Sequence, residues 1–223
     1  MLEVEEFKFV ATPAQGEVSA LMAGPAAADL ILVLGHGAGS ALRHPLMQSL
    51  SDALNAVGVA TLRYNYPYSE RGRGMDGEAV RLATVRAAVA AASKRAGRLP
   101  MFAGGHSMSG RMTSLTQAVA PLPSVRGIVF YAFPLHSGAP DAGRAKHLRE
   151  LSIPLLFLSG TRDKMADQKL LESVVAALPR SALRWIDTAD HSFKVLARRK
   201  SKEPVVEELA RLTRAWMEEQ ATT

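Results

Sequence analysis

The chain alternates between short apolar runs and longer segments in which apolar residues recur every three or four positions. Three β-like runs come first, at 3–11, 18–24 and 29–35. The first alternates polar and apolar residues, as a strand with one solvated face does. The third is almost wholly apolar, which is typical of a buried central strand. This opening predicts an antiparallel sheet edge beside a core strand.

Beyond these runs, helical and strand patterns alternate to the end of the chain. The predicted helices cover 44–58, 77–97, 108–118, 167–179 and 203–220, and the predicted strands cover 59–66, 99–105, 127–133, 154–160 and 182–188. Such alternation indicates an α/β protein with a mostly parallel, twisted sheet of about eight strands and helices on both faces. With no internal repeat or low-complexity linker, residues 1–223 are expected to form a single domain without a separate cap.

The charge balance raises the question of acidic partners. The chain has 27 Lys and Arg against 21 Asp and Glu, a formal charge of +6. Nucleic acid and acidic membranes attract such proteins. The basic residues are thinly spread, however, except at 71–74 and 197–202, and no aromatic residues interleave with them. We interpret them as a solvated helix surface and expect no nucleic-acid or membrane partner, with a basic rim that attracts an anionic substrate as the alternative.

Composition narrows the chemistry further. The chain contains no cysteine, which excludes disulfides, zinc–thiolate sites and cysteine nucleophiles. The N-terminal residues are acidic where a signal peptide would be basic, and no apolar run reaches the roughly 18 residues that a membrane span needs. We therefore expect a soluble, cytoplasmic protein that is a monomer or a homodimer.

The segment AGGHSMSGRM, residues 103–112, joins a predicted strand directly to a predicted helix. It is similar to a nucleophile elbow, G-x-S-x-G in its usual form, in which a sharp turn holds a serine out for attack. Ser107 would be the nucleophile, with Gly105 two positions before it. Ser109 stands where the second glycine is usual, which weakens the match. An ordinary turn built of small residues is the alternative.

The segment LGHGAGS, residues 34–40, follows the apolar strand. Its glycines would let backbone amides point at the negative charge that forms during acyl transfer. The predicted oxyanion donors are the amides of Ala38 and Met108. A phosphate-binding loop is the alternative. It is disfavoured because the segment lacks the Gly-Lys-Ser/Thr ending, and because no acidic residue ends the strand at 59–66 to hold a ribose.

The segment SGTRDKMAD, residues 159–167, follows the strand at 154–160. Asp163 is the predicted acid, which would orient a histidine and stabilise its charged form. A helix N-cap or a surface pair with Arg162 is the alternative for this residue. Asp167 is a second candidate acid, although its position fits better the start of the following helix.

The segment TADHSFK, residues 188–194, follows the last predicted strand and contains His191, the predicted general base. The resulting order, Ser107, Asp163, His191, is the order in which α/β hydrolases carry their triad.

The remaining histidines receive no catalytic role, and His44 and His147 are interpreted as structural or solvated. We expect these residues to line the substrate pocket: His36, Gly37, His106 and His136. No histidine–carboxylate cluster has metal-ligand spacing, so neither a metal nor another cofactor is expected.

Six segments together carry a family resemblance: HGAGS, RYNYPY, GGHSMSGRM, YAFPLHSGAP, GTRD and DHSFK, in this order. From about residue 20 to its C-terminus the chain resembles an α/β hydrolase of the dienelactone-hydrolase-like branch. It most resembles small single-domain proteins related to subunit 3 of a histone-acetyltransferase regulatory complex. The resemblance implies Ser107 as nucleophile, Asp163 as acid and His191 as base, with no cofactor. Some members of that group serve as protein-interaction modules.

The expected function is therefore hydrolysis of a carboxylic ester through an acyl-enzyme, with a thioester or an amide as alternative substrates. The loop at 133–150 is the predicted pocket wall. The alternative function is a catalytically silent α/β-hydrolase scaffold that binds a partner protein.

Overall fold

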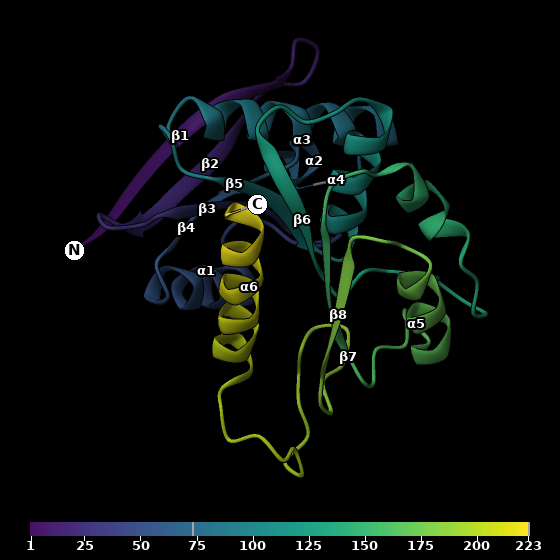
Figure 1. The fold of residues 1–223 in the computed structure, drawn as a ribbon. Coiled ribbons are helices and arrows are strands. Elements are labelled where there is room, and N and C mark those ends of the chain that lie inside the picture. The colour runs from purple at the N-terminus through teal and green to yellow at the C-terminus, as the bar shows by residue number, and fades with distance from the viewer. Residues whose placement is uncertain (73, 223) are drawn as a thin grey trace.

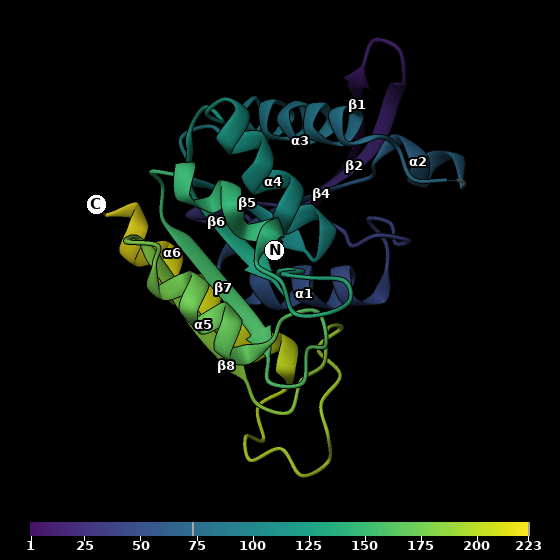
Figure 2. The ribbon, with the colours of Figure 1, turned by 90° about the vertical axis from the view of Figure 1, so that its right-hand side faces the viewer.

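The computed structural model describes residues 1–72 and 74–222. It has one eight-stranded sheet with helices on both faces (Figures 1 and 2). The strands are β1 (Leu2–Thr12), β2 (Gly16–Pro25), β3 (Leu30–Gly35), β4 (Val59–Tyr64), β5 (Met101–His106), β6 (Val125–Tyr131), β7 (Leu155–Gly160) and β8 (Ser181–Ile186). The helices are α1 (Pro45–Ala56), α2 (Pro67–Arg71), α3 (Glu78–Ser93), α4 (Met108–Val119), the 3-10 helix η1 (Gly143–Glu150), α5 (Gln168–Ala176) and α6 (Val205–Ala221).

The sheet has the order β1-β2-β4-β3-β5-β6-β7-β8. β1 pairs antiparallel with β2, and β2 pairs antiparallel with β4, whereas every later pairing is parallel. Figure 1 shows the two opening strands at one edge of the sheet. The predicted fold class and its antiparallel edge are thus confirmed.

The central strands are buried on both faces because helices cover each of them. Leu32 and Leu34 of β3 pack with the residues of α1 and α6, whereas Ile31 and Val33 face α3 and α4. α5 covers β6 and β7 on the side of α3 and α4. Each large apolar side chain buried in this way contributes about 1.5–3 kcal/mol. The layers hold the carboxyl ends of β3, β5 and β7 at one rim, where the candidate site lies.

Two short helices differ from the predicted pattern. α2 and η1 lie in segments expected to be irregular, since neither is long enough to show a helical repeat of apolar residues. The sequence did contain one indication of α2, which is Pro67 at its first position, because proline favours the first turn of a helix. Residues 143–150 still belong to the loop predicted as a pocket wall.

The basic stretch 197–202 lies in the irregular segment between β8 and α6, so its interpretation as helix surface is wrong. Arg199 in this stretch is buried, and its guanidinium group pairs with Glu208 and donates to the Glu203 carbonyl. It fastens the segment to the start of α6. Within the described residues, no helix combines the length and the apolar character needed to span a membrane.

Candidate active site

Ser107 occupies the turn between β5 and α4 with φ 49° and ψ −111°. A positive φ is uncommon for a residue other than glycine and costs about 1–3 kcal/mol, so such residues persist only where the surroundings hold them. Here the Ser107 amide donates to the Tyr131 carbonyl at 2.8 Å, which ties the turn to β6. The turn has the strained geometry expected of a nucleophile elbow.

The backbones around this turn approach too closely for side chains. A Cβ atom on Gly105 would lie 2.4 Å from the carbonyl oxygen of Gly35 on β3. A Cβ atom on Gly104 would lie 2.0 Å from the Val129 carbonyl oxygen on β6. Gly104 and Gly105 are therefore required by packing between neighbouring strands.

Ser109, which stands in place of the usual second glycine, fits because Gly35 makes room for it. A Cβ atom on Gly35 would lie 2.5 Å from the Cβ atom of Ser109. The Ser109 hydroxyl donates to the His36 carbonyl, and it lies 3.0 Å from the Tyr66 hydroxyl, which therefore donates to it. Ser109 thus links the elbow helix to the glycine-rich loop.

Of the three residues predicted as a triad, His191 lies within hydrogen-bond distance of both Ser107 and Asp163. The Nε2 atom of His191 lies 2.8 Å from the Ser107 hydroxyl oxygen. Its Nδ1 atom lies 2.9 Å from each carboxylate oxygen of Asp163. Asp163 is buried, and it also accepts a hydrogen bond of 2.8 Å from the Met165 amide. A carboxylate beside Nδ1 favours the tautomer in which Nε2 is free to accept a proton from the serine.

The acid and base loops are packed against each other at Gly160, where β7 ends. A Cβ atom there would lie 2.2 Å from the Ala189 carbonyl oxygen, and the Arg162 amide donates to the same oxygen at 2.9 Å. The Arg162 side chain donates to the Thr188 carbonyl at 3.1 Å. These contacts join the loop of Asp163 to the loop of His191.

His106 and His36, predicted to line the pocket, lie against backbone carbonyl groups of His191 and Gly37. The Nε2 atom of His106 lies 2.9 Å from the His191 carbonyl oxygen, and the Nδ1 atom of His36 lies 2.8 Å from the Gly37 carbonyl oxygen. Burial lowers the pKa of each ring to about 4. Both rings are therefore neutral at pH 7, and each can donate its single N–H to the neighbouring carbonyl. They position the backbone on either side of Ser107.

Gly37 and His136 are also packed into the protein. A Cβ atom on Gly37 would lie 2.6 Å from the Nδ1 atom of His106. The Nε2 atom of His136 accepts a hydrogen bond of 3.2 Å from the Asp167 amide. Asp167 itself caps α5, since its side chain accepts from the Leu170 amide at 3.0 Å, as the position of this residue predicted.

A cavity of about 240 Å³ opens beside Ser107. Ten described residues line it: Ala38, Met75, Arg81, Ser107, Met108, Arg111, Met112, Pro134, Arg144 and Met165. The lining includes both predicted oxyanion donors, Ala38 and Met108, and two residues of the loop at 133–150, Pro134 and Arg144. It includes none of the three histidines and the glycine that were expected to line the pocket. Ala38 is an exposed residue of the loop that follows β3.

Sequence reasoning missed the arginines and most of the methionines of this cavity. Arg81 comes from α3 and Met75 precedes that helix, far in sequence from the elbow. Arg111 could have been predicted, because it lies one helical turn after Ser107. Side chains at this spacing share a helix face, which places Arg111 near the serine.

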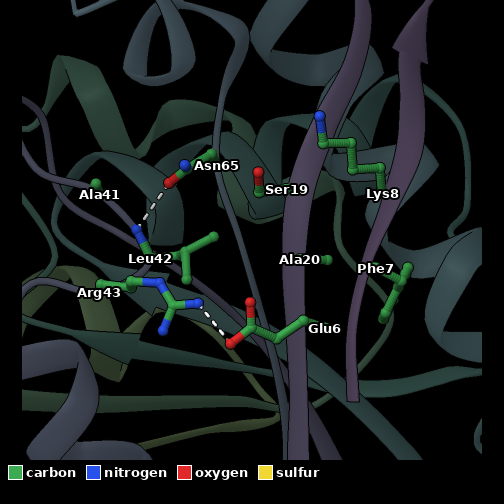
Figure 3. Close-up of a pocket in the computed structure, with 9 residues that line it drawn as sticks. All are labelled: Glu6, Phe7, Lys8, Ser19, Ala20, Ala41, Leu42, Arg43 and Asn65. Carbon is green, nitrogen blue, oxygen red and sulfur yellow. Dashed lines mark hydrogen bonds and ion pairs between the residues drawn. The ribbon is translucent and has the colours of Figure 1, made fainter.

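A larger cavity of about 320 Å³ lies away from Ser107, against β1 and β2 (Figure 3). Two of its three charged residues neutralise each other, since Arg43 pairs with Glu6 at 2.6 Å. Asn65 accepts a hydrogen bond of 2.8 Å from the Leu42 amide. We assign no chemistry to this larger cavity.

Among residues 1–72 and 74–222, no group of three or more His, Asp and Glu side chains is placed to hold a metal ion.

Comparisons with known proteins agree with this fold. A family model described as an alpha/beta hydrolase domain matches residues 28–218. The structure of dienelactone hydrolase from Anabaena variabilis is similar with a TM-score of 0.73 at 19% identity, covering 97% of this chain and 98% of that one. Est1E from Butyrivibrio proteoclasticus has a TM-score of 0.72 at 14% identity, covering 96% and 98%. A serine hydrolase homologue from Coxiella burnetii has a TM-score of 0.71 at 17% identity, covering 93% and 94%.

Proposed function

The chain belongs to the α/β hydrolase family, and on this premise we propose that it hydrolyses a carboxylic ester through an acyl-enzyme on Ser107. The observation that carries the proposal is the continuous contact from Ser107 through His191 to Asp163 at a strained turn. Neutral serine is a weak nucleophile, and an adjacent base held by a third group is the usual means of activating it. Thioesters and amides are the alternative substrates.

In the first half of the reaction, His191 takes the proton of the Ser107 hydroxyl as its oxygen attacks the ester carbonyl. Asp163 holds the imidazole in the required tautomer and stabilises its positive charge. The negative charge that forms on the carbonyl oxygen is stabilised by the amides of Ala38 and Met108. His191 then gives the proton to the leaving alcohol.

In the second half, His191 activates a water molecule that attacks the acyl group on Ser107. The tetrahedral intermediate forms in the same oxyanion hole, and its collapse releases the acid and regenerates the serine. His106 supports both halves by holding the His191 backbone, so we assign it a positioning role rather than a catalytic one.

The decisive experiment is labelling with a fluorophosphonate, which reacts with an activated serine. We expect mass to be added at Ser107, and we expect the label to be lost in Ser107→Ala. Hydrolysis of p-nitrophenyl butanoate should fall by about 10⁴-fold or more in that variant. Ser192→Ala is the matched control, because Ser192 is an exposed serine next to His191 and should leave the labelling intact.

A folded wild-type protein that stays unlabelled and cleaves none of a series of p-nitrophenyl esters would contradict the proposal. It would favour the alternative, a catalytically silent scaffold that binds a partner protein. The relation to subunit 3 of a histone-acetyltransferase regulatory complex, the cytoplasmic location and the single-domain organisation stay predictions from the sequence.

A further inference from the structure

The walls of the cavity beside Ser107 combine positive charge with flexible apolar surface. Three arginines line it, Arg81 from α3, Arg111 from α4 and Arg144 from η1, and no acidic residue is among its described lining residues. The rest of the wall is supplied mostly by four methionines and a proline. Methionine is unbranched and adapts to ligands of irregular shape.

The three arginines keep most of their hydrogen-bond donors free. Arg111 lies 3.4 Å from Glu78, whose side chain is 52% exposed. Neither Arg81 nor Arg144 has an ion pair or a side-chain hydrogen bond with any described residue, although both are only partly exposed. Elsewhere on this protein a cavity arginine is paired, as Arg43 is with Glu6 (Figure 3).

This arrangement is unfavourable without an anion. Like charges around a partly buried space repel each other more strongly than they would in water. The charge of Arg81 also acts on two buried tyrosines. Burial raises the pKa of Tyr66 to about 12 and raises that of Tyr68, whereas Arg81 lowers both pKa values. A bound oxyanion would relieve the repulsion, and guanidinium groups bind carboxylates and phosphates through paired hydrogen bonds.

We propose that the substrate is a small ester that carries an oxyanion group, a carboxylate or a phosphate, on a short apolar chain. This rests on the proposed function of Ser107. The ester carbonyl would lie at Ser107 between the amides of Ala38 and Met108, and the anion would lie against Arg81 and Arg144. The volume of about 240 Å³ limits the substrate to a small molecule, because pockets for drug-sized ligands usually measure about 300–1,000 Å³.

The test uses two matched pairs of esters, since the anion can belong to the acid or to the alcohol part. Monophenyl adipate is compared with methyl phenyl adipate, and 3-(butanoyloxy)benzoate with its methyl ester, by release of the phenol. The wild type should prefer the charged member of at least one pair by about tenfold or more in kcat/KM, the effect of one charge-assisted hydrogen bond.

The variants Arg81→Gln and Arg144→Gln should each reduce this preference by about tenfold or more. Arg149→Gln is the matched control, because Arg149 lies on η1 with Arg144 but is exposed and outside the cavity lining. It makes the same change of charge and should keep the preference. Thermal melting of each variant shows whether the fold is retained, and the preference of the wild type tests the proposal even if a variant does not fold.

Three further outcomes separate this proposal from the proposed function. If the wild type cleaves the neutral member of both pairs as well as the charged one, the substrate class is wrong and the hydrolase stands. If it cleaves no ester and Ser107 takes no fluorophosphonate, both proposals fall. If Ser107 is labelled but no ester is cleaved, monomethyl adipate and butyl phosphate should slow the labelling. The compound that slows the labelling more identifies the anion as a carboxylate or a phosphate. If neither compound slows the labelling, the proposal is overturned.

Discussion

At the scale of the residue, Ser109 departs from the usual elbow pattern, and a glycine elsewhere compensates for it. The added Cβ atom occupies the space that Gly35 leaves on β3. Its hydroxyl donates to the His36 carbonyl of the glycine-rich loop and accepts from the buried Tyr66 hydroxyl. The substitution therefore supplies a connection that glycine could not make.

We predict that Ser109→Ala destabilises the protein by about 1–3 kcal/mol, because it leaves the buried His36 carbonyl without its hydroxyl donor. It also takes the nearer hydroxyl partner from Tyr66, whose other hydroxyl contact is Tyr64 at 3.4 Å. Activity should fall as well, since the loop of Ala38 loses its tie to α4. Urea denaturation and ester hydrolysis measure the two effects. Tyr66→Phe is the control: it keeps the bond from Ser109 to His36 and should retain more activity. Equal stability of Ser109→Ala and wild type would show that the connection is unimportant.

Single residues also mark the limit of what the sequence could predict. The positions of Ser107, Asp163 and His191 after β5, β7 and β8 predicted that their loops meet at one rim. The direction of a side chain within a loop was not predictable in this way, because it depends on the backbone angles of the turn. The rings of His36 and His106 contact backbone carbonyl oxygens, and neither residue is among those that line the cavity beside Ser107.

At the scale of the element, the site depends on the close approach of the loops that follow β7 and β8. Gly160 is the point of contact, and its lack of a side chain lets the Ala189 carbonyl come near. Asp163 and His191 lie a few residues beyond this contact. The separation of Asp163 from His191 is thus set by the packing of two loop backbones.

Gly160→Ala should separate these loops, since the new Cβ atom would lie 2.2 Å from the Ala189 carbonyl oxygen. We expect a loss of about 1–3 kcal/mol in stability from overpacking. A loss of about 10²-fold in kcat should follow if the base shifts by about 1 Å. Gly138→Ala is the control, because nothing lies within 4 Å of a Cβ atom there. Full activity of Gly160→Ala would contradict this account.

Elements differ in how well their sequences predict them. The long helices and the core strands were predictable because burial on one or both faces imposes a repeat on many residues. α2 and η1 bury too few side chains to show a repeat. Their effect on the site is nevertheless direct, since η1 carries Arg144 into the cavity wall and Met75 lies between α2 and α3.

At the scale of the whole molecule, the fold holds three histidines in environments that exclude their charged form. Burial lowers the pKa of His36, His106 and His147 to about 4 each. The Nε2 atom of His147 lies 2.7 Å from the Ser114 hydroxyl, which joins η1 to α4. All three rings therefore help to hold neighbouring segments together while they are neutral.

These shifts predict how stability depends on pH. In the unfolded chain the histidines bind protons near pH 6.5, whereas in the folded protein they do so only near pH 4. The unfolded state therefore binds more protons between these values, and stability must fall as the pH drops through that window. Within this window, each histidine lowers the free energy of unfolding by up to about 1.4 kcal/mol for each pH unit of acidification. The effect is smaller where the ring is partly exposed to water.

Urea denaturation at pH 7.5, 6.5, 5.5 and 5.0 measures this dependence. The free energy of unfolding should be nearly constant above about pH 7 and should decrease progressively below 6.5. The pair of Asp29 with Arg214 acts mainly at lower pH, because the guanidinium group holds the pKa of this carboxyl below its usual value. His147→Gln should flatten the curve by up to about a third, since it removes one of the three groups. A wild-type curve that stays flat from pH 6.5 to 5.0 would mean that these rings already accept protons in the folded protein, and that their burial does not exclude the charge.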